Sequence, residues 1–281
     1  MKNYIKSLIL MTFVVFASCE DVIDVDLDNV EPRLVIEASL DWEKGTAGNE
    51  QTINLSMSTP YFNTGEDTSV SGAVVTVTNT NSGAIFTFND QNDGSYTVDN
   101  FVPVIGDTYR LDVSYAGENY EATETLMSVT DINSITQSIE GGFDDELLEV
   151  NVYFDDPADE ENFYLMRYYE AGDLFPYFED ISDEFVNGNE VHDFFEKEDD
   201  EDNNEAPFEP GDVVDIKLYG ISEQYYNYMR LLIEQYYSGG DPFSSNSAQI
   251  RGNCINPTNP DQYAFGYFRA TQVNVTSYTF Q

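Results

Sequence analysis

Hydrophobic and polar residues alternate in short runs through the first half of the chain, which is the pattern of half-buried β-strands. In YRLDVSY, for example, Leu111 and Val113 fall on one face and Asp112 falls on the other. Residues that tolerate turn conformations separate the runs, at Asn81-Ser82-Gly83, Asn92-Asp93-Gly94 and Ala116-Gly117. The spacing predicts a mainly β protein that begins with an antiparallel sandwich of immunoglobulin-like type over residues 33–128.

Aromatic residues become frequent in the second half, where 27 of the 39 Tyr and Phe residues lie between positions 129 and 281. Four runs there have the strand pattern: LLEVNVYF, NFYLMRYYE, VVDIKLYG and QVNVTSYTF. One segment has helical spacing instead, with Ser222 as N-cap, a stripe of Tyr225, Tyr228, Met229, Leu232 and Tyr236, and Gly239-Gly240 as terminator. We therefore expect a second β-rich domain over 129–281 with one amphipathic helix at 222–237. The helix stripe either packs on a sheet, which we favour, or forms a ligand platform.

The segment EKEDDEDNNEAPFEP, residues 196–210, is rich in carboxylates and could be interpreted as a calcium loop. Its spacing departs from the EF-hand pattern, because Asn204 stands where the turn glycine is required. An acidic insertion that stays in solvent is the preferred interpretation, and we expect no bound metal.

A dense aromatic group, LFPYF, lies at residues 174–178 between Asp173 and Glu179. Its proline and its charged flanks favour a loop over a helix. Large aromatic side chains are enriched at binding surfaces, so Phe175, Tyr177 and Phe178 are the candidate binding residues. The alternative is that these rings cover the core of their own domain.

The N-terminus has the layout of a bacterial lipoprotein signal peptide over residues 1–18, with early lysines and an apolar run too short to span a bilayer. Phe16-Ala17-Ser18-Cys19 resembles a lipobox, which makes Cys19 the lipid attachment site; the alternative is an ordinary secretory signal. Residues 19–32 form an acidic tether. Its first acids, Glu20 and Asp21, resemble an export signal to the cell surface, although a plain solvated tether has the same composition. We expect an outer-membrane protein, anchored by lipid and facing the exterior.

The formal net charge of −42 restricts the possible partners. A surface this acidic repels phosphate backbones, which excludes nucleic acid, and it repels anionic headgroups, so membrane contact should run through the lipid alone. Apart from Cys19 the chain has only Cys254, so no disulfide can form within the mature chain.

The chemistry-bearing residues do not form a catalytic motif. His192 is the single histidine and lies next to the acidic insertion, where a solvated role is expected, and Cys254 has no nearby base in the sequence. Neither GxSxG nor a P-loop nor GxGxxG occurs. A pair of carboxylates could hydrolyse a glycoside, but 53 acidic residues give no means of choosing a pair. We expect neither an enzyme nor a cofactor.

Three blocks carry a family resemblance: CEDVIDVDL…EPRLVIEASL, the central hairpins, and RGNCINPTNPDQYAFGYFRA. Over essentially the whole mature chain, the sequence resembles a Bacteroidota surface lipoprotein family known as a domain of unknown function, DUF4249. Members are typically encoded beside TonB-dependent outer-membrane receptors. The resemblance implies a receptor-associated role at the cell surface and transfers no catalytic residue.

Three classes of function follow. The first, which we favour, is an accessory or ligand-capturing partner of a TonB-dependent receptor in nutrient uptake. The second is a structural or adhesive surface lipoprotein, and the third is a glycan or peptide hydrolase.

Overall fold

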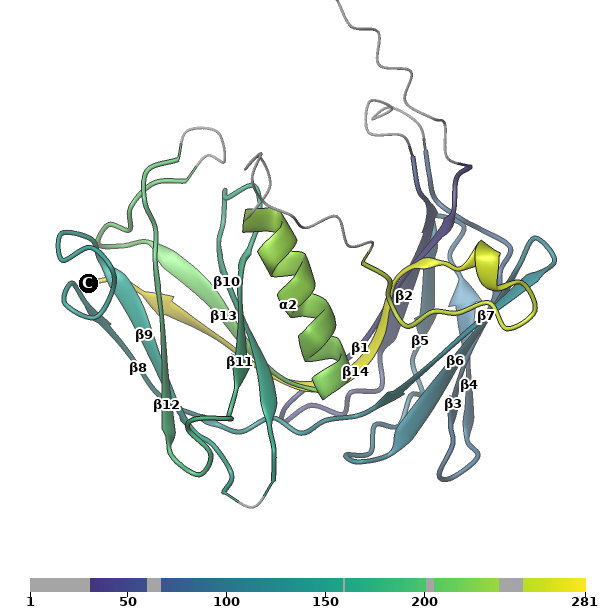
Figure 1. Ribbon diagram of the computed structural model, residues 1–281, viewed down its shortest axis with the longest axis horizontal. Coiled ribbons are helices and arrows are strands. Elements are labelled where there is room, and N and C mark those ends of the chain that lie inside the picture. The colour runs from purple at the N-terminus through teal and green to yellow at the C-terminus, as the bar shows by residue number, and fades with distance from the viewer. Residues whose placement is uncertain (1–30, 60–66, 159, 201–204, 238–249) are drawn as a thin grey trace, which may run out of the picture. The chain divides into compact units, whose positions relative to one another are not determined.

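In the computed structural model, two β-sheets and one α-helix account for most of the described chain (Figure 1). The structure describes residues 31–59, 67–158, 160–200, 205–237 and 250–281. The larger sheet has eleven strands in the order β11-β10-β13-β14-β1-β2-β5-β4-β3-β6-β7, and the smaller sheet has three in the order β12-β9-β8. The expectation of a mainly β protein is confirmed. The signal peptide, Cys19, Glu20, Asp21 and nearly all of the tether lie outside the described residues.

The bounds of the elements are as follows. The strands are β1 (Leu34–Glu43), β2 (Gln51–Met57), β3 (Val74–Asn79), β4 (Ile85–Asp90), β5 (Ser95–Val98), β6 (Thr108–Tyr115), β7 (Glu118–Thr125), β8 (Ile132–Ser138), β9 (Glu149–Asp155), β10 (Phe163–Glu170), β11 (Tyr177–Ser182), β12 (Glu190–Glu196), β13 (Val213–Ile221) and β14 (Phe265–Thr279). The helices are α2 (Glu223–Tyr237) and the short 3₁₀ helix η1 (Pro260–Gln262).

The alternation in the first half of the chain produces the first core. On β6, Leu111 and Val113 are almost fully buried, as the pattern predicts. The turns also match the expectation, because Asn92 and Ala116 adopt positive φ values of 65° and 51° at the hairpin tips. Apolar side chains from β1 to β7 pack against one another and exclude water.

The C-terminal strand β14 joins the two halves of the larger sheet. It runs parallel to β1 and antiparallel to β13. Cys254, Phe268 and Ala270, from the end of the chain, pack into the first core. The sheet is therefore mixed, whereas the sequence predicted a purely antiparallel sandwich. A parallel neighbour from so far along the chain leaves no local sequence pattern.

In the second half, the strands of the larger sheet carry a core on each face. One face packs against the small sheet through residues such as Phe154 and Tyr164. The other face carries α2, which contacts β10 and β11 (Figure 1). The Tyr225 N–H donates a hydrogen bond of 3.1 Å to the Ser222 hydroxyl, so Ser222 caps α2 as predicted. This arrangement brings the end of α2 next to β11.

Candidate functional site

The aromatic group at 174–178 lies at the start of β11, one of the two edge strands of the larger sheet. Phe175 and Pro176 precede the strand, but Tyr177 and Phe178 are its first two residues. The predicted loop therefore covers only part of the group, because pairing with β10 extends the strand to Tyr177. Pro176 is compatible with this, since proline is tolerated just before an edge strand. Successive side chains of a strand point to opposite faces, so Tyr177 and Phe178 face different surroundings.

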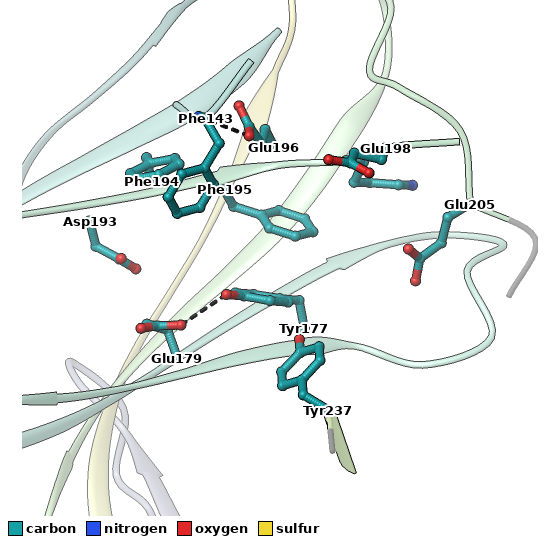
Figure 2. A pocket seen from close by; sticks show the side chains of 11 residues that line it. Phe143, Tyr177, Glu179, Asp193, Phe194, Phe195, Glu196, Glu198, Glu205 and Tyr237 are labelled. Atoms are coloured by element: carbon teal, nitrogen blue, oxygen red, sulfur yellow. Dashed lines mark hydrogen bonds between the residues drawn. The ribbon is translucent and has the colours of Figure 1, made fainter. Parts of the chain in front are cut away.

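Tyr177 faces a cavity of about 450 Å³ between β11 and β12, which we call the acidic pocket (Figure 2). Its walls combine aromatic rings with carboxylates. Tyr177 stacks on Phe195 with the ring centroids 4.8 Å apart, and Phe143 meets Phe194 edge to face at 5.2 Å. The lining residues are Phe143, Tyr177, Glu179, Asp193, Phe194, Phe195, Glu196, Lys197, Glu198, Glu205 and Tyr237.

The carboxylates of the acidic pocket are held in a partly desolvated setting. Burial raises the pKa of Asp193 to about 7, even though the Tyr168 hydroxyl donates a hydrogen bond of 2.7 Å to its carboxylate. Burial also raises the pKa of Glu179, which accepts a bond of 2.9 Å from the Tyr177 hydroxyl (Figure 2). Burial disfavours the charged form of both carboxyl groups, so a cation bound in the pocket would stabilise that charged form.

Lys197 is the one cation among the described residues that line the pocket, and it is already neutralised. Its ammonium group is 2.6 Å from Glu170 and 2.7 Å from Asp173, and the side chain is 2% exposed. Burial acts to lower the pKa of Lys197, but these two carboxylates outweigh burial and raise it. The net charge presented to a ligand is therefore negative. The sequence interpretation placed Lys197 in a solvated insertion, but its side chain is buried.

A glycine loop positions Phe143 at the pocket wall. The N–H groups of Gly141 and Gly142 donate to the buried carboxylate of Glu149 at 2.7 and 2.8 Å, and the Phe143 N–H donates to Glu196 at 2.9 Å. A side chain at Gly142 would meet the carboxylate of Glu196, which would have to move aside. Glu196 Oε2 is buried and has no hydrogen-bond partner among the described residues. Sequence reasoning missed this loop, although the glycine pair was its visible signal.

Phe178 faces a second hollow of about 330 Å³, which we call the apolar groove. Its walls are the residues before and at the start of β11 and the C-terminal half of α2. Phe175 and Tyr236 meet edge to face at 6.4 Å, and both remain more than half exposed, at 51% and 58%. Of the predicted helix stripe, Tyr225 and Met229 are buried on the sheet, whereas Tyr236 is not. The lining residues are Phe175, Pro176, Phe178, Met229, Leu232, Ile233, Tyr236 and Tyr237.

The other residues singled out in the sequence lie outside both hollows. His192 is exposed, stacks on Tyr153 at 4.6 Å, and has its Nε2 2.6 Å from the Asn151 side chain. Cys254 is buried in the first core, and burial raises the pKa of its thiol to about 12, which is unsuitable for a nucleophile. Within the described ranges, no group of three or more His, Cys, Asp and Glu residues is arranged to hold a metal ion.

Comparison with protein families gives one decisive match. The family described as "Domain of unknown function (DUF4249)" matches residues 20–277. The chain belongs to this family. A comparison with curated protein sequences finds no match. None of the described helices has the length and apolar character needed to cross a membrane.

The similar solved structures are distant β-proteins. The FN1–FN3 domains of chicken CNTN1 share 14% identity at a TM-score of 0.26, over 69% of this chain and 62% of that one. This DUF4249 chain thus covers less than two thirds of that fragment. A two-domain fibronectin type III segment of chicken tenascin shares 12% identity at a TM-score of 0.21, over 69% of this chain and 91% of that one. A chain of a cytokine receptor complex shares 7% identity at a TM-score of 0.27, over 88% and 95%.

Proposed function

We propose that this DUF4249 protein is a lipid-anchored lipoprotein of the outer-membrane surface that acts as an accessory or ligand-capturing partner of a TonB-dependent receptor. The lipobox ending at Cys19 and the acids Glu20 and Asp21 support the location. The gene neighbourhood typical of the family supports the receptor partner. The protein contributes a binding surface, and the receptor contributes transport.

The observation that carries this proposal is the pairing of two aromatic-lined hollows around β11. Their exposed rings, Phe175, Tyr236 and Tyr237, offer stiff contact area of the kind that dominates binding surfaces. Neither His192 nor Cys254 lies in the lining of either hollow. The site supports binding better than it supports covalent chemistry.

The raised pKa of Asp193 is the one observation that favours a hydrolase, because a general acid needs such a value near neutral pH. Against this role, the Asp193 carboxylate already accepts a hydrogen bond of 2.7 Å from the buried Tyr168 hydroxyl. If the pocket were catalytic, a glycan or peptide library would be turned over by the wild type and not by Asp193→Asn. We expect no turnover by either.

We also propose a division of labour within the chain. Residues 33–128 form an immunoglobulin-like sandwich that acts as a spacer. Residues 129–281 form the second β-rich domain and carry the binding face. The concentration of exposed aromatic rings around β11 and α2 supports this division.

Membrane attachment is tested by fractionating cells that express Cys19→Ala. We expect this variant to leave the membrane fraction and to incorporate no labelled fatty acid. Cys254→Ala is the matched control, because it removes the other cysteine from a buried site. Fatty-acid labelling of Cys19→Ala would show that the anchor is elsewhere.

The receptor partnership is tested by pulling the protein down from gently solubilised membranes and identifying its partners by mass spectrometry. A β-barrel receptor should co-purify with the wild type and be reduced with Phe175→Ala/Tyr236→Ala. Phe185→Ala is the control, since Phe185 is 89% exposed and lines neither hollow. Failure to recover any receptor with the wild type would refute the partnership.

A further inference from the structure

We propose that β11 binds an internal, extended segment of the partner protein by strand addition, and that this segment alternates basic and apolar side chains. The inference deepens the proposed function, since it rests on the existence of a protein partner. It identifies where that partner binds and what kind of sequence it presents. Three features of the structure carry it: an open strand edge, two unlike hollows beside that edge, and the charge of one of them.

The open edge follows from the strand order. Among the described residues, β11 pairs with β10 alone. The N–H of Asp183 donates to the carbonyl of Asn162 at 3.2 Å, which continues the β10–β11 ladder by one bonded pair. Bonded and non-bonded pairs alternate in an antiparallel ladder. The backbone N–H and C=O groups of Phe178, Asp180 and Ser182 therefore point away from β10, where an added strand would meet them.

The two hollows lie on opposite faces of β11. Tyr177 and Glu179 line the acidic pocket, and Phe178 lines the apolar groove. A strand added beside β11 continues both faces of the sheet, so its successive side chains would point alternately toward the two hollows. The backbone hydrogen bonds would supply affinity, and the hollows would select the side chains.

Charge determines which side chains fit each hollow. The acidic pocket has five carboxylates, from Glu179, Asp193, Glu196, Glu198 and Glu205. Its only cation among the described residues is occupied by two further carboxylates. Lysine or arginine side chains complement this charge and can also lie over the aromatic walls. The apolar groove has no charged residue in its lining, so leucine, valine or phenylalanine fits there.

The same charges exclude two other occupants. Antiparallel pairing of β11 with a second copy would bring Glu179 and Asp180 against the same acids of that copy, between molecules of net charge −42. A free peptide ligand would bring a terminal carboxylate, for which neither hollow offers an available cation among its described lining residues. An internal segment of a larger partner brings no such charge.

The other edges of the sheets do not offer both hollows. At the far edge of the larger sheet, β7 is bridged by Ile255 through Glu121, which occupies that edge. In the small sheet, β12 borders the acidic pocket, but none of its residues lines the apolar groove. Only β11 among the described edges of these two sheets borders both the acidic pocket and the apolar groove.

The probe for this inference is a fluorescent peptide of roughly eight residues that alternates lysine and leucine and is capped at both ends. Fluorescence anisotropy should show saturable binding to the full mature protein at moderate salt. The same peptide with N-methyl groups on alternate amides keeps its charge and side chains. It loses the N–H groups along one strand edge, which are the donors that would bond to β11. We expect it to bind at least about tenfold more weakly, and a glutamate–leucine peptide to show no binding.

Protein variants test the edge itself. Asp180→Pro removes an outward N–H and places the proline ring on the open side, while the bonds to β10 remain possible. Asp180→Ala is the matched control, because it removes the same carboxylate and keeps the N–H. We expect at least about tenfold weaker binding for the proline variant and near wild-type binding for the alanine variant. Glu198→Gln/Glu205→Gln should weaken binding of the lysine peptide, and Glu50→Gln/Asp99→Asn, distant exposed acids, should not.

Equal binding of the N-methylated and unmethylated peptides would overturn strand addition, even if the proline variant failed to fold. An equal loss of peptide binding in the Glu50→Gln/Asp99→Asn variant would overturn the assignment to the acidic pocket.

Receptor pull-down separates this inference from the proposed function. A receptor that co-purifies equally with wild type and a folded Asp180→Pro variant leaves the function standing and refutes the strand edge. Peptide binding at β11 without any co-purifying receptor leaves the edge standing and refutes the partnership.

Discussion

Arg269 of the DUF4249 protein connects β14, β1 and α2, and its replacement tests how the helix wall of the apolar groove is held. Its guanidinium group forms two bonds with Asp41, at 3.0 and 2.8 Å, and a third with the Tyr225 hydroxyl at 2.8 Å. It also lies 4.7 Å from the Tyr219 ring centroid. Arg269→Ala removes all of these contacts at once.

The expected loss of unfolding free energy follows from the burial of Arg269 and Asp41. Breaking a buried ion pair costs about 3–5 kcal/mol, because the remaining charge is left without compensation. The Asp41 side chain is 30% exposed, so water can partly stabilise its charge once Arg269 is removed. The lost contact with the aromatic ring adds about 0.5–1 kcal/mol. We expect Arg269→Ala to lower the free energy of unfolding by about 2–4 kcal/mol. Arg269→Lys should lower it by about 1–2 kcal/mol, since lysine keeps the charge and loses the two-pronged geometry.

Urea unfolding followed by tyrosine fluorescence measures these changes. A double-mutant cycle with Asp41→Asn isolates the pair, and the two single variants should be non-additive. Arg230→Ala is the control, because Arg230 forms an exposed ion pair with Glu234 on the solvent side of α2 and should change stability little. Equal stability of wild type and Arg269→Ala would refute the reasoning, as would full additivity with Asp41→Asn.

Three further predictions follow from buried groups. Asp193→Asn should raise the melting temperature most at about pH 8 and change it little only at about pH 3.5, because above its ordinary pKa of 3.8 Asp193 ionises in the unfolded chain, whereas burial keeps it protonated in the folded chain until about pH 7. Thermal scans check this, and an equal shift at both pH values would contradict it. Gly142→Ala should cost about 0.5–1.5 kcal/mol in urea unfolding, because Glu196 would have to move aside and lose its bond from the Phe143 N–H. Cys254 should resist alkylation in the native protein and react after unfolding, as mass spectrometry would show; rapid native labelling would place the thiol at the surface.

Local patterns in the sequence were sufficient to predict most of the strands and the helix. Period-two alternation buries Leu111 and Val113 because one face of each strand meets a core. The α2 helix begins after its cap, Ser222, as the spacing predicts. These features depend on neighbours within a few residues, which is the range over which sequence periodicity carries information.

The candidate site was only partly predictable because its walls come from distant segments. Phe175, Tyr177 and Phe178 were named from their density, but their division between two hollows depends on pairing with β10. Lys197 was assigned to a solvated insertion, whereas Glu170 and Asp173 hold it in a buried position. Such long-range pairs leave no periodic signal, and an acidic chain offers too many candidate partners.

The acids on β11 explain how an open strand edge can be kept on this protein. An exposed edge is a template for unwanted pairing, and proteins protect it with charged side chains. On β11 the consecutive Glu179 and Asp180 serve this purpose, since any copy of the same edge carries the same charges. Protection by one sign of charge is selective, because it repels acidic strands and attracts basic ones. Glu179, which also lines the acidic pocket, therefore both opposes pairing of the protein with itself and favours a basic segment.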